Sequence, residues 1–229
     1  MGMKLEQVVP FGRSLDEYIK MFNLTSHDLQ KSMLSVGDGP ASFNAEGTKA
    51  GYRIKSIDPL YTFTAEQISR RFYEVVDNII EQVKSTPDDW VWTYHGSPDE
   101  LRKNREQATA LFCEDYQQGK ATGRYEIGEL PNLEYRDHEY ELGLCSHFLF
   151  LYSEHFTENF HVNAIFEMLR VCQEVRIFPL LTLMLKPSQH LKPVIEKLVA
   201  SGYRCEIQRV SYGLQRGGNQ MLKITKRAA

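Results

Sequence analysis

The sequence predicts an α/β protein with a doubly wound, seven-stranded and mostly parallel sheet, whose last strand runs antiparallel. Short apolar runs alternate with helical patterns along the chain, which is typical of parallel strands joined by crossover helices. A glycine-bearing turn at 37–39 follows the first apolar run, and Asp58 ends the second. The last two strand-like segments, 204–211 and 220–225, are joined by a loop too short for a crossover helix. The final strand is therefore expected to enter the sheet antiparallel.

Local signals define the elements of the first half of the chain. Ser14 and Glu17 have the spacing of a capping box, so a helix to about residue 22 is expected to form a cap before the sheet. Thr64 and Gln67 repeat that spacing, and Pro98 suits the first position of a later helix. The expected elements are a helix at 14–22, a strand at 33–36, a helix at 42–50, a strand at 53–57, a long helix from 64, an extended piece at 90–94 and a helix from 97 to about 118.

The second half continues the alternation of strands and helices. Strands are expected at 124–128, 140–146 and 174–178, helices at 158–172 and 191–199, and the terminal strand pair at 204–211 and 220–225. The whole chain, 1–229, is predicted to be one domain, with 61–123 as a helical insertion between the second and third strands. The insertion is expected to shape a substrate pocket, to form a homodimer interface or to act as a structural cap.

Composition limits the function classes. With 229 residues, of which 42% are hydrophobic, the chain can bury a substantial core. A net charge of −3 argues against a large nucleic-acid interface. The four cysteines are far apart and are expected to be reduced thiols. No signal-peptide core or apolar run of membrane-spanning length occurs in the sequence, so we expect a cytoplasmic protein without a membrane partner.

The glycine turn and Asp58 together suggest a nucleotide pocket. Gly37 and Gly39 allow the backbone to approach a ligand closely, and a carboxylate at the end of the next strand can accept both ribose hydroxyls. An alternative reading is purely structural, because Asp58 precedes Pro59 and Asp-Pro pairs often start turns.

The order of these features resembles the class I S-adenosylmethionine-dependent methyltransferases. The segment 34–39 is similar to the first-strand motif of that family, Asp58 to its ribose-binding acid, 129–133 to the segment lining the adenine, and 144–148 to the exit of the fourth strand. Two positions depart from the pattern: Ser35 stands where the family usually has an acid, and Ala41 where it has a third glycine. The resemblance implies S-adenosyl-L-methionine as the cofactor and, as its binding residues, Ser35, Gly37, Asp38, Gly39, Asp58, Pro59, Glu129, Leu130 and Ser146.

The resemblance also places the reactive methyl near the exit of the fourth strand. Arg13, Tyr18 and Phe148 are then expected to border or cap the substrate. His147 is a candidate general base, and a packed, hydrogen-bonded histidine is the alternative. His155 and His161 lack the spacing of a zinc motif, so no metal is expected.

Three segments give a narrower resemblance. Residues 10–14, 37–44 and 146–153 are similar to a bacterial subgroup of such proteins without an assigned substrate. The expected activity is methyl transfer to a small-molecule acceptor. The alternatives are a non-catalytic S-adenosylmethionine-binding protein and an NAD-dependent oxidoreductase.

Overall fold

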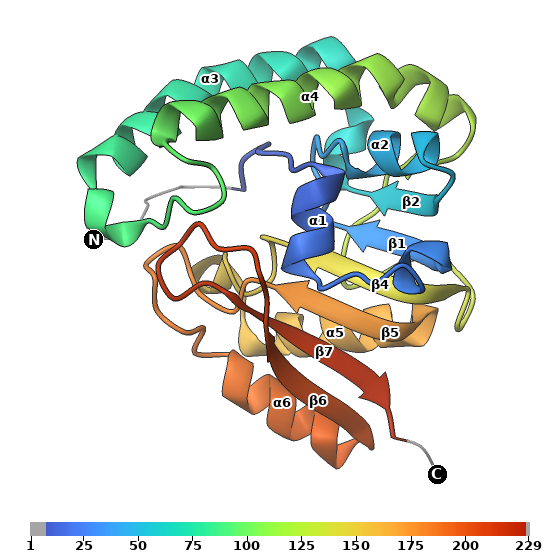
Figure 1. Ribbon diagram of the computed structural model, residues 1–229. Helices are drawn as coiled ribbons and strands as arrows, with labels where there is room; N and C mark the ends of the chain where they lie inside the picture. The colour runs from blue at the N-terminus through green and yellow to red at the C-terminus, as the bar shows by residue number, and fades with distance from the viewer. Residues whose placement is uncertain (1–7, 228–229) are drawn as a thin grey trace.

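A computed structural model describes residues 8–227, in which seven strands form one sheet in the order β3-β2-β1-β4-β5-β7-β6 (Figure 1). Strands β1, β2, β3, β4 and β5 are parallel, and β7 lies antiparallel between β5 and β6. The predicted sheet with a reversed last strand is therefore confirmed. The strands are β1 (Ser32–Val36), β2 (Arg53–Ile57), β3 (Tyr125–Glu126), β4 (Tyr140–Ser146), β5 (Cys172–Phe178), β6 (Tyr203–Arg209) and β7 (Gln220–Lys226).

Helices cover both faces of this sheet. Alternate residues of a strand point to opposite faces, so Met33 belongs to one core cluster and Leu34 to the other. The cluster containing Met33 holds the buried sides of α1 (Leu15–Met21), α2 (Phe43–Lys49) and α3 (Ala65–Ser85). The cluster containing Leu34 holds those of α5 (Glu158–Val171) and α6 (Leu191–Ala200). Because helices cover both faces of the sheet, β1 buries apolar side chains on both sides: Met33 on one, and Leu34 and Val36 on the other.

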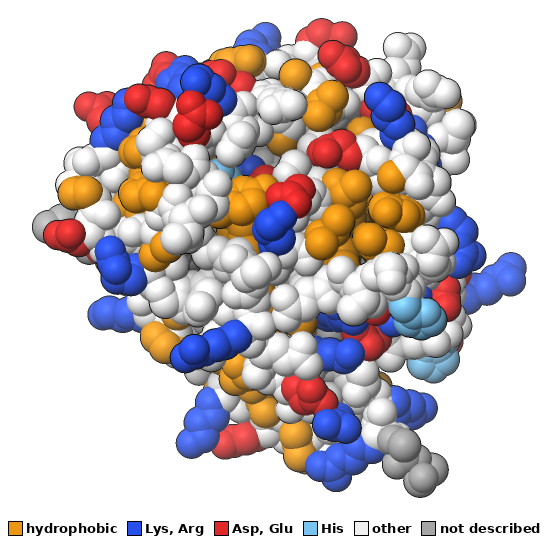
Figure 2. Space-filling model, viewed as in Figure 1, with side chains coloured by type: hydrophobic (Ala, Val, Ile, Leu, Met, Phe, Trp, Pro, Cys, Tyr) orange, Lys and Arg blue, Asp and Glu red, His pale blue; other side chains and the backbone are white. Residues whose placement is uncertain are grey.

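The insertion is built from two long helices. Helix α3 and α4 (Pro98–Ala121) lie side by side above the edge of the sheet (Figure 1). A capping box of Thr64 and Gln67 opens α3, and the Ser97 hydroxyl caps α4. Helix α3 buries a regular apolar stripe, whereas charges of both signs gather on the surface over α3 and α4 (Figure 2). The insertion therefore packs its apolar side inward, toward α1 and the end of the sheet.

Two predicted elements differ from the structure. The extended piece expected at 90–94 is shorter in the structure: Trp90 is extended and forms an isolated antiparallel bridge with Gln215, but a turn begins at Thr93. The Trp90 indole donates to the Thr86 hydroxyl at 3.0 Å and the Val91 N–H donates to the Leu214 carbonyl at 2.7 Å, so isolated hydrogen bonds hold this segment in place of a neighbouring strand. Strand β3 spans two residues instead of 124–128. It lies at the sheet edge with β2 as its partner, so fewer ladder bonds extend it.

No described helix has the length and apolar character that crossing a membrane requires. Within residues 8–227, no group of three or more His, Cys, Asp or Glu side chains is placed to hold a metal ion.

Candidate active site

A cavity of about 420 Å³ lies at the carboxyl ends of β1, β2 and β4, within the size range of small-molecule sites. Parallel strands bring their carboxyl ends to one edge, which explains how residues far apart in the sequence meet here. The lining includes nearly every residue predicted for the site: Arg13, Tyr18, Gly37, Asp38, Gly39, Asp58, Pro59, Glu129, Leu130, Ser146, His147 and Phe148.

The glycine turn has the backbone geometry that its residues suggest. Gly37 has φ +67° and Gly39 has φ +56°, values that other residues adopt only with strain. A Cβ atom on Gly37 would lie 3.1 Å from the Phe148 ring, whereas one on Gly39 would meet nothing within 4 Å. Gly39 therefore presents bare backbone to the open part of the cavity.

Asp58 lies opposite this turn and holds it in place. Its Oδ2 accepts from the Gly39 N–H at 2.8 Å, and its Oδ1 accepts from the Leu60 N–H at 2.7 Å. The second bond makes Asp58 the N-cap of a short 3-10 helix, Pro59–Thr62. Burial raises the pKa of Asp58 to about 6 despite these two bonds. Each oxygen keeps one lone pair for a ligand, so the carboxylate can both fix the turn and accept hydroxyl groups.

Asp38 is held by three hydroxyl groups below the cavity. Its Oδ1 accepts from Tyr18 and from Ser35, and its Oδ2 accepts from Ser56 at 2.6 Å. Burial raises the pKa of Asp38, although all three hydrogen bonds favour the charged form. Ser35 itself is fully buried and does not line the cavity. The contact between Ser35 and a cofactor stays a prediction; in the structure the short Ser35 side chain reaches Asp38.

Several apolar side chains also line the cavity. Glu129 is exposed, and Leu130 is buried beside it in the sequence. Leu60 and Phe63 follow Asp58 in the chain, and Phe160 comes from α5. An apolar wall next to the Asp58 carboxylate suits a flat ring attached to a sugar.

His147 follows the last residue of β4. It has φ +52°, its N–H donates to the Phe178 carbonyl, and its Nδ1 lies 2.9 Å from the Ser146 hydroxyl. Burial, followed by the positive charge of Arg13, holds the pKa of His147 well below its usual range. The ring is therefore neutral, and it is half-buried in the wall of the cavity.

A second, smaller cavity of about 70 Å³ adjoins the first. Val9, Phe11, Arg13 and His147 line both. Most other side chains of the second cavity are apolar and come from the insertion, the segments after β4 and β5, and the β6–β7 loop: Ile79, Val83, Trp90, Leu101, Leu151, Leu183, Tyr212 and Leu214. The insertion therefore contributes directly to the site.

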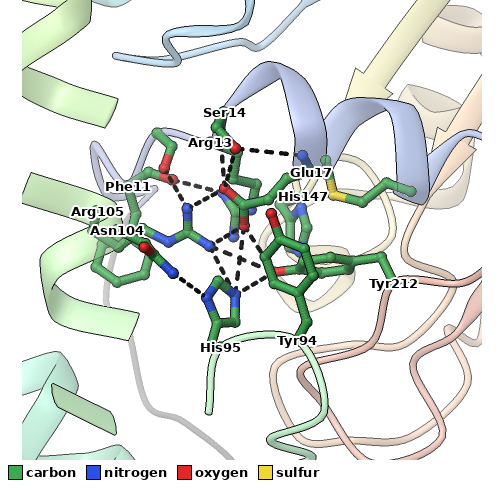
Figure 3. Close-up of polar contacts among 12 residues, drawn as sticks. Phe11, Arg13, Ser14, Glu17, Tyr94, His95, Asn104, Arg105, His147 and Tyr212 are labelled. Carbon is green, nitrogen blue, oxygen red and sulfur yellow. Dashed lines mark hydrogen bonds and ion pairs between the residues drawn. The ribbon is translucent and has the colours of Figure 1, made fainter. Parts of the chain in front are cut away.

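A buried polar cluster lies beside the junction of the cavities (Figure 3). Arg105 of α4 forms a bidentate ion pair with Glu17 of α1, and both side chains are less than 2% exposed. The Tyr212 hydroxyl donates to Glu17 at 3.1 Å and lies 3.0 Å from His95 Nε2. Asn104 donates to His95 Nδ1 at 2.9 Å, so a neutral Nε2–H tautomer lets His95 accept from Asn104 and donate to Tyr212.

The charges of this cluster explain its pKa values. The Arg105 guanidinium holds the pKa of Glu17 at about 2 against the opposing effect of burial. Burial, followed by the charge of Arg105, lowers the pKa of His95 to about 3. The cluster thus joins α1, α4, the loop at His95 and the β6–β7 loop through one ion pair.

Several residues of the site carry no sequence signal. Arg71 of α3 lines the large cavity, and Arg105 is buried although α4 is largely polar. Leu60 and Phe63 follow Asp58 closely, so proximity to the predicted acid could have identified them. In the sequence, Glu17 is recognisable only as part of the capping box with Ser14. No neighbouring residue indicates that it pairs with Arg105.

Comparison with known proteins gives relatives in both sequence and structure. No protein-family model matches the chain. The chain is 32% identical, over 225 residues, to the uncharacterized protein MJ0045 of Methanocaldococcus jannaschii, covering 98% of this chain and 99% of that one. That relative is archaeal, so the narrower resemblance to a bacterial subgroup is unconfirmed.

Solved structures with similar folds include methyltransferases. The mitomycin 7-O-methyltransferase MmcR superposes with a TM-score of 0.50 at 11% identity, over 93% of this chain and 54% of the longer enzyme. The magnesium protoporphyrin IX methyltransferase ChlM of Synechocystis PCC 6803, with bound cofactor, gives a TM-score of 0.45 at 13% identity, over 86% of this chain and 70% of that one. The chain therefore has the fold of the S-adenosylmethionine-dependent methyltransferases and belongs to the same protein family as the Methanocaldococcus protein.

Proposed function

We propose that this protein is an S-adenosylmethionine-dependent methyltransferase with a small-molecule acceptor. The observation that carries the proposal is the convergence of Gly39, Asp58 and His147 on one cavity that adjoins a second, mostly apolar one. The methyltransferase fold supports it. The antiparallel β7 disfavours the alternative of an NAD-dependent oxidoreductase, since NAD-binding domains keep a parallel sheet.

The residues of the large cavity fit S-adenosylmethionine. Asp58 would accept the ribose hydroxyls, and the apolar wall formed by Leu60, Phe63 and Leu130 would hold the adenine. Gly39 lets the backbone come close to the ligand, because no side chain intervenes. These roles use side chains that the structure already orients toward the cavity.

The bound cofactor supplies an electrophilic methyl group on a positively charged sulfur. The protein then has to align the acceptor, exclude water and receive a proton where the acceptor carries one. Phe11 and Phe148 line the cavity and restrict water. No hydrogen bond among the described residues engages His147 Nε2, so this nitrogen is available to the acceptor.

The lining of the second cavity supports a small acceptor. Side chains of α3, α4 and the β6–β7 loop surround it, including Ile79, Leu101 and Leu214. A polymer such as DNA or RNA would need an open and positively charged surface. A net charge of −3 agrees with the small-molecule proposal.

Replacement of Asp58 tests the cofactor site. Asp58→Asn should weaken S-adenosylmethionine binding at least tenfold, because a hydrogen bond to a charged group contributes about 1.5–3 kcal/mol. Isothermal titration calorimetry at pH 7 measures the effect. Asp137→Asn, which removes an exposed carboxylate paired with Arg170, should leave affinity unchanged. Equal affinities for the wild type and Asp58→Asn would contradict the ribose assignment.

The same carboxylate predicts a pH dependence. With a folded pKa of about 6, Asp58 is mostly protonated at pH 5, and affinity should fall about tenfold between pH 7 and pH 5. The amino-acid end of the cofactor does not titrate in this range. The raised pKa also affects the free energy of unfolding. Protonation of Asp58 stabilises the folded state fully at pH values below the pKa of the unfolded chain, and this stabilisation is lost as pH rises through about 6. Asp58→Asn should bind equally weakly at both pH values, and a matching pH dependence in that variant would assign the titration to another group.

A further inference from the structure

Arg13 occupies the junction of the two cavities. It precedes the N-cap of α1 and lines both cavities, together with His147 (Figure 3). Among the described residues, it is the one charged side chain in the lining of the smaller cavity. A cation at this position faces the place where the acceptor would meet the cofactor.

The Arg13 guanidinium has no carboxylate partner among the described residues. Its Nη1 donates to the Phe11 carbonyl at 2.6 Å, and its buried Nε has no hydrogen-bond partner. Glu17 is the nearest acid that acts on it, but the Glu17 oxygens already accept from Arg105, Tyr212 and the Ser14 N–H. A buried donor without a partner is costly, so such groups call for a ligand.

The charges around Arg13 do not cancel. Arg105 is fully buried and Arg13 is half-buried, whereas Glu17 is the one carboxylate of the cluster. Burial and the neighbouring arginines lower the pKa values of His95 and His147, so both histidines are neutral. Burial, followed by the charge of Arg105, also lowers the pKa of Arg13. Within this cluster, one positive charge is therefore left without a carboxylate partner.

We propose that Arg13 is the counter-ion of a carboxylate, or another single negative charge, on the methyl acceptor. The apolar part of that acceptor would lie against Trp90, Phe178 and Leu214 in the smaller cavity. Its volume of about 70 Å³ holds a group of only a few heavy atoms. The proposal rests on the methyltransferase function above and specifies its substrate class as small anions.

Anion binding would also act on His147. The charge of Arg13 disfavours protonation of His147, and a carboxylate paired with Arg13 would offset that charge. His147 would then become a better proton acceptor when the anionic acceptor is bound. This coupling gives Arg13 a positioning and electrostatic role without contact with the transferred methyl.

The test compares an anion with its neutral isostere. Propionate and propionamide have nearly the same shape and differ in charge. Thermal unfolding is measured with each, at constant ionic strength, for the wild type and Arg13→Met, both empty and loaded with S-adenosylhomocysteine. Calorimetry with S-adenosylhomocysteine is run separately on both proteins.

We expect propionate to raise the melting temperature of the loaded wild type and to leave Arg13→Met unchanged, with no effect of propionamide on either. Arg13→Met should bind S-adenosylhomocysteine with near wild-type affinity. Without ligand, this variant should melt about 2–5 °C higher than the wild type, because an unpaired buried charge is removed.

Two results would overturn the proposal. In the first, S-adenosylhomocysteine abolishes the effect of propionate on the wild type, and Arg13→Met binds S-adenosylhomocysteine at least tenfold more weakly. This result would assign Arg13 to the amino-acid end of the cofactor. In the second, propionate and propionamide have equal effects on the melting temperature. This result would contradict the anion site, because the charge would make no difference. A wild type that does not bind S-adenosylhomocysteine but still responds to propionate through Arg13 would overturn the methyltransferase function and support the anion site.

Discussion

Replacement of Arg105 by methionine is expected to destabilise the protein by about 3–5 kcal/mol. The change leaves the Glu17 carboxylate buried without its cation, and burial of an unpaired charge is among the most costly changes in a protein. For a domain of this size, the melting temperature should fall by roughly 6–20 °C. The loss of the Arg105 bonds to Glu17 and to the Gly12 carbonyl should also loosen α1 from the insertion.

Arg102 provides the matched control on the same helix. Its guanidinium pairs with Asp77 and Glu106 at the surface, where ion pairs contribute about 0–1 kcal/mol. Arg102→Met should therefore shift the melting temperature by no more than a few degrees. Glu17→Gln combined with Arg105→Met should cost less than the sum of the two single changes, since the double variant removes both charges of the pair. Similar melting temperatures for Arg102→Met and Arg105→Met would refute the energetic role of the buried pair.

Gly39→Val is expected to abolish detectable cofactor binding, with an affinity loss of a hundredfold or more. At φ +56°, a β-branched residue is strained, and its side chain would project into space that is open in the cavity wall. The turn would also lose its alignment with Asp58, which accepts from the Gly39 N–H. Calorimetry with S-adenosylmethionine, well below the melting temperature, measures the loss.

Gly51→Val separates backbone strain from loss of the site. Gly51 has φ +88° and nothing within 4 Å of its Cβ position, but it lies after α2 and outside the cavity. This variant should lose a comparable amount of stability while keeping wild-type affinity. Normal cofactor binding by Gly39→Val would show that the cofactor does not lie against the glycine turn.

Local patterns in the sequence determined most of the secondary structure. The bounds predicted for β2 and β4 match the structure, and the capping boxes at Ser14 and Thr64 open helices as expected. Caps and apolar periodicity depend on neighbours within a few residues, so they can be read from the chain alone. The extended piece predicted at 90–94 is shorter in the structure, because aromatic residues that favour strands also pack well within turns.

The position of the large cavity was also accessible from the sequence. The glycine turn and Asp58 end neighbouring parallel strands, and topology alone brings such ends together. The structure adds that Ser35 lies beneath the cavity and supports Asp38, because alternate residues of β1 face opposite sides of the sheet.

The sequence by itself determined the sheet, its reversed last strand and the position of the cavity. Only the tertiary structure decided which charges are buried and which of them lack a partner. Glu17 lies 88 residues from Arg105 and 195 from Tyr212, and no local pattern encodes those contacts. Arg13 resembles an ordinary surface arginine until the fold encloses it and assigns the nearby carboxylate to Arg105. Burial and charge balance depend on every element packed around a group, whereas helix caps and strand periodicity depend on near neighbours.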